Sequence, residues 1–426
     1  MSKKFLVGGA VRDELLNRPI HDRDYVVVGA TVEEMLAQGY KQVGKEFPVF
    51  LDENGEEYAL ARKEISTGDK YTDFKFIFTP DITLREDLER RDFTVNALAK
   101  DLDTGVLTDY FNGLTDLKNG IIRHINSEHF VEDPLRVLRG IRQSCEFQLY
   151  NDFVIAEDTL RLMQDMTQKG MLNALTEERV WKEIEKALNT PYFYLFIHYL
   201  DVIGALEVIL PEVATLKNVP ENTEYHPEGN AYAHTILTLK EVAQYNLNGK
   251  DLALVNFALM CHDLGKALTP KEELPAHHGH DFNGLKIINK LCNRLKVPND
   301  FRDFAKTFCN YHMQFYNFLD RRTVTQYDLI ETLTKFKDNH VMNLIQKCHA
   351  CDKLGREGFI KPERVELMLK VFNRMNLIYT ILYNIGLKDL PQEVQERLSH
   401  YKGEKFGKLY RDAKISYLKA HLKTQV

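Results

Sequence analysis

The sequence has no long hydrophobic run that is free of charge. Its most apolar stretch, residues 192–210, is interrupted by His198, Asp201 and Glu207. A membrane span needs about 20 nearly uncharged residues, so we expect a pair of buried helices there and no membrane partner. The apolar part of the N-terminus, residues 5–7, is too short for a secretory signal.

Cysteine is scarce as well. The 426 residues contain six cysteines, and no low-complexity linker or internal repeat separates parts of the chain. Without a secretory signal, cysteines at this density are expected to be reduced thiols, which predicts a cytoplasmic protein. With 44% hydrophobic and 28% charged residues, the composition is that of a globular protein and excludes disorder.

The chain also lacks an excess of positive charge. It contains 56 Lys and Arg residues and 62 Asp and Glu residues, which gives a formal net charge of −6. A polyanionic partner must therefore bind a local basic face. Residues 401–426 carry seven basic side chains against Glu404 and Asp412, and this block is either a solvated helix face or a contact for a phosphate backbone. The basic residues of the block are Lys402, Lys405, Lys408, Arg411, Lys414, Lys419 and Lys423.

The length and the periodicity predict an α+β protein of several domains. A chain of 426 residues exceeds the roughly 250–300 at which a single core stops growing. Strand-like and helix-like segments alternate in residues 1–125, and helical periods dominate from about residue 133 onward. Strands are predicted at residues 5–7, 25–28, 47–51 and 57–62, and a helix at 33–38. Polar turn residues at 219–222 favour a boundary there, which gives regions 1–125, 126–222, 223–355 and 356–426.

A glycine pair follows the first predicted strand and opens a helix. Gly8 and Gly9 allow a close backbone approach, and the helix N-terminus offers free N–H groups to a phosphate. Arg12 lies in the first turn, where its guanidinium can reach the same anion.

Two carboxylates, Asp22 and Asp24, stand immediately before the strand 25–28. Residues two apart in a strand point to one face, so these carboxylates project side by side. A divalent cation relieves their repulsion, and Mg²⁺ favours one or two carboxylates together with substrate phosphates. Glu57 is a candidate third carboxylate, with an exposed residue at a strand end as the alternative.

Two further segments are rich in arginine. In residues 90–98, Arg-Arg-Asp-Phe-Thr-Val-Asn-Ala-Leu, the paired Arg90 and Arg91 suit a triphosphate. Asp92 and Asn96 are four apart, which predicts that they lie on one helical face that ribose hydroxyls could meet. In residues 132–142, Asp133 is predicted as a helix N-cap with Pro134 at the first helical position. Asp133 accepts and Arg136 donates, so together they can pair with the edge of a base. The basic stripe of this second segment continues through Arg139 and Arg142.

The second half carries a His-Asp pair, His262-Asp263, behind an apolar helix. Imidazole and carboxylate suit one divalent metal, and His234 upstream and Asp352 downstream complete a ligand set. Four further histidines, His277, His278, His280 and His312, make a second metal site conceivable. Zinc at Cys348 and Cys351 is disfavoured, because the segment reads as helix and has no second Cys-x-x-Cys knuckle.

These motifs resemble a known family. Residues 8–13 with 22–24 are similar to the opening motif of class II tRNA nucleotidyltransferases and bacterial poly(A) polymerases, and residues 90–97 and 132–136 match two later motifs of that family. Residues 177–183 look like its last motif, here interpreted as structural with Trp181 in the core. The order His, His-Asp, Asp resembles the HD phosphohydrolases. Together the motifs resemble a CCA-adding enzyme joined to an HD domain.

The resemblance implies a polymerase-β-like catalytic domain, a helical nucleotide-reading and tRNA-binding region, an HD domain and a helical C-terminal region. Asp22 and Asp24 would bind Mg²⁺, Asp133 and Arg136 would select CTP and ATP over UTP and GTP, and Arg91, Arg139 and Arg142 would hold the nucleotide. The HD site would hydrolyse 2′,3′-cyclic phosphates and 2′-phosphates with Ni²⁺ or another transition metal. The partners would be tRNA, CTP and ATP, with the protein a monomer or a homodimer.

Two alternatives remain open. A bacterial poly(A) polymerase shares the catalytic motifs, although the HD signature and the lack of a long basic tail argue against it. An HD nucleotide phosphohydrolase with a degenerate polymerase-like module is disfavoured by the intact Asp22, Asp24, Arg91 and Asp133.

Overall fold

The computed structural model describes residues 2–43, 49–66, 74–334, 339–356, 358 and 361–423. The chain forms two compact units, residues 1–209 and 210–426. Residues 219–222, where the sequence favours a boundary, lie inside the second unit, because Leu216 and Val219 are buried there. The finer division into four regions stays a prediction.

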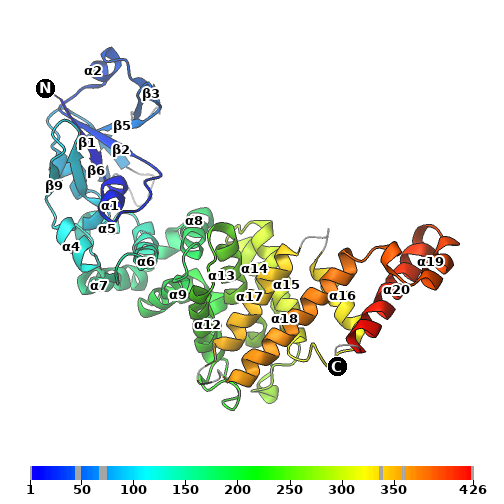
Figure 1. Ribbon diagram of the computed structural model, residues 1–426. Coiled ribbons are helices and arrows are strands. Elements are labelled where there is room, and N and C mark those ends of the chain that lie inside the picture. Colours follow the sequence, from blue (N-terminus) through cyan, green and yellow to red (C-terminus); the bar gives the residue numbers. More distant parts are fainter. Residues whose placement is uncertain are drawn as a thin grey trace. The chain divides into compact units, whose positions relative to one another are not determined.

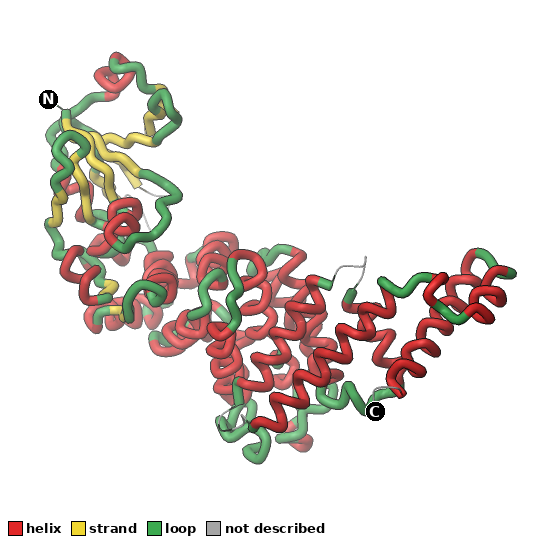
Figure 2. The backbone as a smooth tube through the Cα atoms, viewed as in Figure 1, coloured by secondary structure: helices red, strands yellow, loops and turns green. Residues whose placement is uncertain are grey.

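Seven strands of the described first unit form one mixed sheet (Figures 1 and 2). Their order across the sheet is β3 (Lys41–Val43), β4 (Val49–Leu51), β5 (Glu57–Leu60), β2 (Asp24–Val28), β1 (Lys3–Val7), β8 (Leu98–Asp101) and β9 (Leu107–Asp109). β2 and β5 are parallel and the other neighbours are antiparallel. The strands predicted at 5–7, 25–28 and 57–62 are confirmed, the last ending at Leu60. Of the strand predicted at 47–51, residues 47 and 48 lie outside the described residues.

Alternation along β2 divides its side chains between two apolar cores. Val26 packs with Leu88 of α3 (Leu84–Glu89) on one side of the sheet. Val27 packs on the other side with Met35 of α2 (Val32–Ala37), the helix that the sequence predicts at 33–38. Both faces of β2 are covered, which fixes its register and the position of Asp24 at its start.

The rest of the first unit is mainly helical. A hairpin of β6 (Lys63–Ser66) and β7 (Phe74–Ile77) and a parallel pair of β10 (Ile121–Ile122) and β11 (Val154–Ile155) complete its strands in the described residues. Phe193 and Leu206 are fully buried in α9 (Phe193–Val202) and α10 (Leu206–Ile209), which confirms the predicted buried helix pair. The helices are α1 (Gly9–Leu15), η1 (Thr94–Asn96), α4 (Gly113–Asn119), α5 (Ser127–Val131), α6 (Leu135–Phe147), α7 (Glu157–Gln168), η2 (Met171–Ala174), α8 (Glu177–Leu188), α9 (Phe193–Val202) and α10 (Leu206–Ile209).

Helices build the described part of the second unit, which Figure 2 draws without strands. Its central helix is α13 (Gly249–Cys261), which is apolar on nearly all sides. It packs against α12 (Ala231–Lys240), α15 (Asn299–Tyr311) and α17 (His340–Leu354). The others are α11 (Pro211–Ala214), η3 (Thr215–Asn218), α12 (Ala231–Lys240), η4 (Glu241–Gln244), η5 (Leu264–Leu268), η6 (Lys271–Glu273), α14 (His280–Arg294), α15 (Asn299–Tyr311), η7 (His312–Phe315), α16 (Thr323–Leu333), α17 (His340–Leu354), α18 (Pro362–Tyr383), η9 (Leu387–Asp389), α19 (Gln392–Ser399) and α20 (Gly403–Lys423).

The basic block at the end of the chain lies on α20, and its cations differ in their environment. Lys414 is buried and donates to the backbone oxygen of Leu382. Arg411 forms an ion pair with Glu331. The block is therefore less uniformly solvated than its sequence suggests. Its exposed cations are Lys402, Lys405, Lys408 and Lys419.

All six cysteines are buried and none forms a disulfide. Cys348 and Cys351 lie inside α17. None of the helices in the described ranges has the length and apolar character needed to cross a membrane.

Candidate nucleotide site and metal centre

The first unit contains a pocket of about 620 Å³ at the end of the sheet where β2 begins. All eleven residues that the sequence analysis places in the nucleotidyltransferase site line it. They are Gly9, Arg12, Asp22, Asp24, Arg91, Asp92, Asn96, Asp133, Arg136, Arg139 and Arg142.

The turn between β1 and α1 requires glycine. Gly8 has φ 71° and ψ −131°, a conformation that side chains disfavour, and its N–H donates to Leu98 O at 3.0 Å. A Cβ atom on Gly8 would lie 2.5 Å from Arg91 Nη1. The absence of a side chain thus lets the first helix begin directly beside Arg91.

The carboxylates Asp22 and Asp24 are exposed at the start of β2. Within the described part of the chain, neither forms an ion pair. Glu57 is the register partner of Asp24 in the parallel pair β2–β5, so the two side chains stand next to each other on one face. Glu57 also lines a smaller cavity with Asp24 and Arg91. The structure therefore brings the candidate third carboxylate to the aspartate pair.

A hydrogen-bonded chain crosses the floor of the pocket. Arg12 Nη1 donates to Asn96 Oδ1 at 2.5 Å, Asn96 Nδ2 donates to Asp92 Oδ1 at 2.8 Å, and Arg139 Nε donates to Asp92 Oδ2 at 2.8 Å. The prediction that Asp92 and Asn96 lie on one face of a helix is wrong. α3 ends at Glu89, and the two residues meet across a turn and the short helix η1 instead.

The charge of Asp92 is stabilised by this chain. Burial alone would raise the pKa of Asp92, but the charge of Arg139 and the hydrogen bonds from Asn96 and Arg139 outweigh it and lower this pKa to about 2. The carboxylate raises the pKa of Arg139 in turn. Asp92 is therefore ionised at neutral pH and holds Arg139 at the pocket wall.

Asp87, a buried carboxylate of α3, positions the arginine pair. Arg90 Nη2 lies 2.9 Å from Asp87 Oδ1, and Arg91 Nη2 lies 3.5 Å from Asp87 Oδ2. Burial raises the pKa of Asp87, but the two guanidinium groups lower it further than burial raises it. The sequence analysis did not identify Asp87. The only indication in the sequence was that Asp87 precedes Arg90 by three residues and Arg91 by four. This spacing is also common on exposed helices.

The proposed base-reading residues are held at the start of α6. Asp133 Oδ1 accepts from the Leu135 N–H at 3.1 Å, and Asp133 Oδ2 accepts from Arg179 Nη2 at 2.8 Å. The predicted N-cap was placed one residue early, because Pro134 occupies the cap position before Leu135. Arg136 donates to the backbone oxygens of His129 and Arg90, at 2.6 and 2.8 Å.

Arg179 lines the pocket although the sequence analysis interpreted its motif as structural. The motif lies at the start of α8. The feature of the sequence that could have indicated a site residue was an arginine within a segment that resembles a family motif. Trp181 is buried two residues on, as predicted.

Arg142 is more deeply engaged than the sequence suggested. It is 7% exposed, and its guanidinium contacts Glu183 at 2.5 Å and Glu146 at 2.7 Å. Burial would lower the pKa of Arg142, but these two carboxylates raise it above its ordinary value. Arg142 therefore ties α6 to α8 in addition to bordering the pocket.

The second unit brings its four predicted metal ligands together in a buried cluster. His234 comes from α12, His262 and Asp263 follow α13, and Asp352 lies on α17. His234 Nε2 is 3.1 Å from Asp352 Oδ1, and His262 Nε2 is 3.1 Å from Asp263 Oδ2. Ligand atoms of His234, His262 and Asp352 lie within 4.8 Å of one another, the spacing of a metal site.

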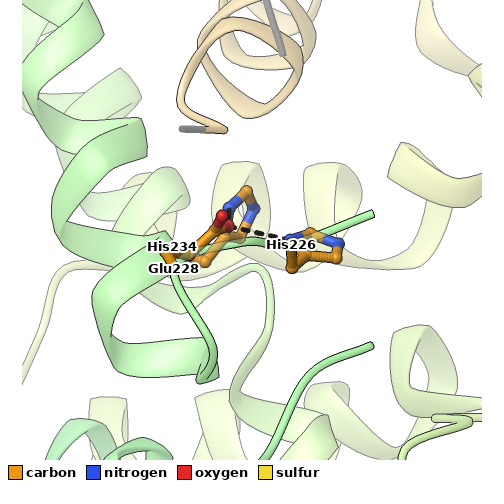
Figure 3. Close-up of side chains that lie close together, drawn as sticks. All are labelled: His226, Glu228 and His234. Atoms are coloured by element: carbon orange, nitrogen blue, oxygen red, sulfur yellow. Dashed lines mark hydrogen bonds and ion pairs between the residues drawn. The ribbon is translucent and has the colours of Figure 1, made fainter. Parts of the chain in front are cut away.

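Backbone and carboxylate contacts set the orientation of both histidine rings. His262 Nδ1 lies 2.7 Å from Leu259 O, so it carries the proton and leaves Nε2 as an acceptor. His234 Nδ1 lies 3.0 Å from Glu228 Oε1, which also accepts from His226 Nδ1 at 2.9 Å (Figure 3). One carboxylate oxygen shared by two ring nitrogens requires N–H groups on both. Glu228 therefore orients His234, and the sequence analysis missed it.

The carboxylates of the cluster are kept ionised. Burial raises the pKa of Asp263, but His262 and Lys266 outweigh burial and lower it well below its ordinary value. Lys266 Nζ lies 2.8 Å from Asp263 Oδ2 and 2.6 Å from Glu221 Oε1. The pKa of Asp352 is lowered despite burial by its hydrogen bond with His234. A cation entering the cluster meets deprotonated oxygen ligands.

Two family models match the first unit and the first residues of the second. The poly(A) polymerase head domain matches residues 4–123, and the probable RNA- and SrmB-binding site of polymerase A matches residues 152–217. Together with the mixed sheet and the paired aspartates, the head-domain match defines a nucleotidyltransferase of the poly(A) polymerase type.

Relatives extend the likeness over nearly the whole chain. The multifunctional CCA protein of Pasteurella multocida strain Pm70 is 45% identical over 394 residues, which cover 92% of this chain and 92% of the relative. The multifunctional CCA protein of Vibrio vulnificus strain YJ016 is 44% identical over 369 residues, covering 85% and 89%. The chain belongs to the multifunctional CCA protein family.

Solved structures share the fold. A CCA-adding enzyme in complex with ATP superposes with a TM-score of 0.61 at 20% identity, over 98% of this chain and 86% of the other. The CCA-adding enzyme of Thermotoga maritima in complex with tRNA gives a TM-score of 0.57 at 20% identity, over 99% and 92%.

Proposed function

We propose that the first unit adds C, C and A to the 3′ end of tRNA, using CTP and ATP without a nucleic-acid template. The observation that carries this proposal is the convergence of all eleven predicted residues on one pocket. The 45% identity to a relative named multifunctional CCA protein supports it. A tRNA substrate would be consistent with a cytoplasmic reaction.

The residues of this pocket suit Mg²⁺. Asp22 and Asp24 offer exposed carboxylates that are free of ion pairs within the described residues, with Glu57 beside Asp24. Bound there, a divalent ion supplies charge stabilisation for attack of the terminal 3′-hydroxyl on the α-phosphate, with pyrophosphate as the leaving group. Arg91 and Arg12 bind the phosphates opposite the carboxylates, and the Asp92–Asn96 pair faces the ribose.

Asp133 and Arg136 select the base. Cytosine and adenine both present an amino donor beside a ring-nitrogen acceptor, which suits a carboxylate that accepts and a guanidinium that donates. Uracil and guanine present a carbonyl and a ring N–H, so polar groups would remain unpaired. Arg179 holds the Asp133 carboxylate in place.

The second unit acts as a phosphohydrolase on 2′,3′-cyclic phosphates and 2′-phosphates. Its ligand set suits a transition metal such as Ni²⁺, because two imidazoles and two carboxylates converge. His262 Nε2 is buried and has no hydrogen-bond partner among the described residues, which is consistent with a role as a metal ligand. A bound cation would polarise the phosphoester, while Lys266 and Glu228 keep Asp263 and His234 in position.

Incubation with tRNA that lacks its terminus, together with labelled CTP and ATP, tests the nucleotidyltransferase. Ordered incorporation of two C and one A supports the proposal. A poly(A) polymerase would instead add repeated A without C, and a degenerate module would add nothing. Release of phosphate from 2′-phosphorylated nucleotides in the presence of Ni²⁺ tests the hydrolase.

A further inference from the structure

A small pocket adjoins the cavity that leads to the metal-ligand cluster of the second unit. The cavity has a volume of about 480 Å³, and its lining includes Asp263, His280, His312 and Asp352. The neighbouring pocket has a volume of about 260 Å³ and is lined mainly by residues of η7, α17 and α18. The two spaces share three lining residues, so a ligand in the pocket can extend into the cavity. The shared residues are Tyr225, Tyr316 and Arg356.

The side chains of this pocket are aromatic, aliphatic or cationic. Phe315, Tyr316 and His349 contribute rings, so we call it the aromatic pocket. Three basic side chains also line it, and none of its described lining residues is acidic. Aromatic rings bind the planar face of any nucleobase, and basic side chains favour a ligand that carries phosphate. The basic residues are Lys353, Arg356 and Arg364.

One lining residue of the aromatic pocket has a buried polar atom without a partner. His349 is 2% exposed, and its Nδ1 has no hydrogen-bond partner among the described residues. Burial, together with the charge of Lys353, lowers the pKa of His349 to about 3, so the ring is neutral at neutral pH. A neutral imidazole donates through one nitrogen and accepts through the other. A ligand with its own donors and acceptors would satisfy this atom, and a purely apolar ligand would not.

Tyr316 connects the aromatic pocket with the metal-ligand cluster. Its hydroxyl donates to Asp352 Oδ2 at 3.3 Å and accepts from Arg356, whose Nη2 lies 3.7 Å from Asp352 Oδ1. Lys353 lies over one face of the Tyr316 ring, so a ligand would meet this ring at its other face or at its edge. Tyr225 is half exposed where the two spaces adjoin and can stack on a ligand ring. A base held there lies one side chain away from Asp352.

We propose that the aromatic pocket binds the nucleobase of the hydrolase substrate, while the attached ribose phosphate occupies the adjoining cavity. The inference rests on the proposed hydrolase function and narrows its substrates to nucleosides with a 2′-phosphate or a 2′,3′-cyclic phosphate, either free or at the 3′ end of an RNA. Pockets for drug-sized ligands measure about 300–1,000 Å³, so this smaller pocket suits a single ring system. A lipid chain would use neither the basic side chains nor the unpaired nitrogen of His349.

A pair of substrates tests the pocket on the full chain loaded with Ni²⁺. 2′,3′-Cyclic AMP and glycerol 1,2-cyclic phosphate share the cyclic phosphate, and only the first carries a base. The wild type should have the higher kcat/KM for 2′,3′-cyclic AMP. His349→Phe, which keeps a flat ring without nitrogens, and Tyr225→Ala should each lower the ratio of the two kcat/KM values about 10-fold. Tyr110→Ala, a change at an exposed tyrosine of the first unit, is the control and should leave the ratio unchanged.

A dinucleotide that ends in a 2′,3′-cyclic phosphate identifies the source of the base. Its hydrolysis should depend on His349 and Tyr225 in the same way. A kcat/KM above that of 2′,3′-cyclic AMP indicates RNA ends as substrates, and a lower value indicates free nucleotides. Circular dichroism shows whether His349→Phe has unfolded, in which case Tyr225→Ala decides.

Photolabelling gives a readout that does not depend on hydrolysis. Irradiation of the full chain with 2-azidoadenosine, followed by mass spectrometry of its peptides, should label residues of the aromatic pocket, and His349→Phe should weaken this labelling. An unlabelled pocket, or equal losses of kcat/KM for both cyclic phosphates in the two variants, would overturn the proposal. Hydrolysis of both substrates without labelling would refute the base pocket and leave the hydrolase standing. A labelled pocket in a protein that hydrolyses neither substrate would support the base pocket and refute the hydrolase.

Discussion

Arg179 donates a 2.8 Å hydrogen bond to Asp133, and this contact joins α8 to the residue proposed to read the base. The Asp133 carboxylate is thereby oriented from one side by Arg179 and from the other by the Leu135 N–H. If Asp133 reads the base as proposed, selection of the nucleotide should also depend on Arg179, 46 positions farther along the chain.

Removing Asp133 should relax base selection. We expect Asp133→Ala to lower kcat/KM for CTP and ATP about 10- to 100-fold, because hydrogen bonds to charged groups contribute about 1.5–3 kcal/mol. The kcat/KM of this variant for UTP and GTP should fall by a much smaller factor. Arg179→Met should shift selectivity in the same direction by a smaller factor, whereas the exposed Arg161→Met should change nothing. Steady-state incorporation of each nucleotide into tRNA lacking its CCA measures this. Wild-type selectivity in Asp133→Ala would end its proposed role.

Glu57 should contribute to catalysis through its place beside Asp24. We expect Glu57→Gln to lower kcat for both nucleotides roughly 10-fold or more while KM changes little, because a carboxylate lost beside the metal weakens charge stabilisation in the transition state. Glu53→Gln, an exposed change in the neighbouring turn, is the control. Equal kcat values for the two variants would show that Glu57 does not contribute to catalysis and is only an exposed residue at a strand end.

The two chemistries should be separable. Asp22→Ala or Asp24→Ala should abolish nucleotide addition and leave phosphohydrolase activity intact, and His262→Ala or Asp263→Ala should have the opposite effect. The reason is that each ligand set lies within its own unit. Both activities are assayed on each variant after circular dichroism confirms folding. Loss of both in one folded variant would contradict two independent sites.

The glycine at the first turn should act through Arg91. In Gly8→Ala the new Cβ would lie 2.5 Å from Arg91 Nη1, so we expect weaker binding of all four nucleotides by a similar factor, as for Arg91→Ala. The backbone strain should also cost about 1–2 kcal/mol of stability. Gly105→Ala is matched in φ, at +70°, but has no atom within 4 Å. It should lose stability without losing nucleotide affinity, and calorimetry of CTP binding compares the two. If both variants bind CTP equally well, Gly8 does not act through Arg91.

The depressed pKa of Asp92 should appear in the pH dependence of stability. Its pKa is about 2 in the folded protein and close to 3.8 unfolded, so its stabilising effect is complete above the unfolded value and is lost as pH falls toward 2. Between pH 5 and pH 3 the wild type should lose about 1 kcal/mol more than Asp92→Asn. Urea unfolding at both pH values measures the difference, with the exposed Asp103→Asn as control. An identical pH dependence in Asp92→Asn and wild type would show that the Arg139 contact does not hold the charge.

Local patterns in the sequence predicted much of both candidate sites. The glycine pair, the Asp-x-Asp before an apolar strand and the His-Asp dipeptide after an apolar helix depend only on residues a few positions apart. Strand and helix periodicities constrain such residues directly, so β1, β2, α2 and the buried pair α9–α10 were predictable. The Asp92–Asn96 helical face failed because the chain turns after Glu89, and packing outweighed the spacing.

Only the tertiary structure decided which distant residues meet. Glu57 reaches Asp24 through the parallel pairing of β2 and β5, and Arg142 is drawn to Glu183 by the packing of α6 on α8. Glu228 reaches His234 through the turn before α12. His280 and His312 meet Asp263 where three separate segments pack together. Such contacts produce no periodic pattern in the sequence. They arise when apolar faces of helices and strands are buried, and many different pairings of these elements could bury the same faces.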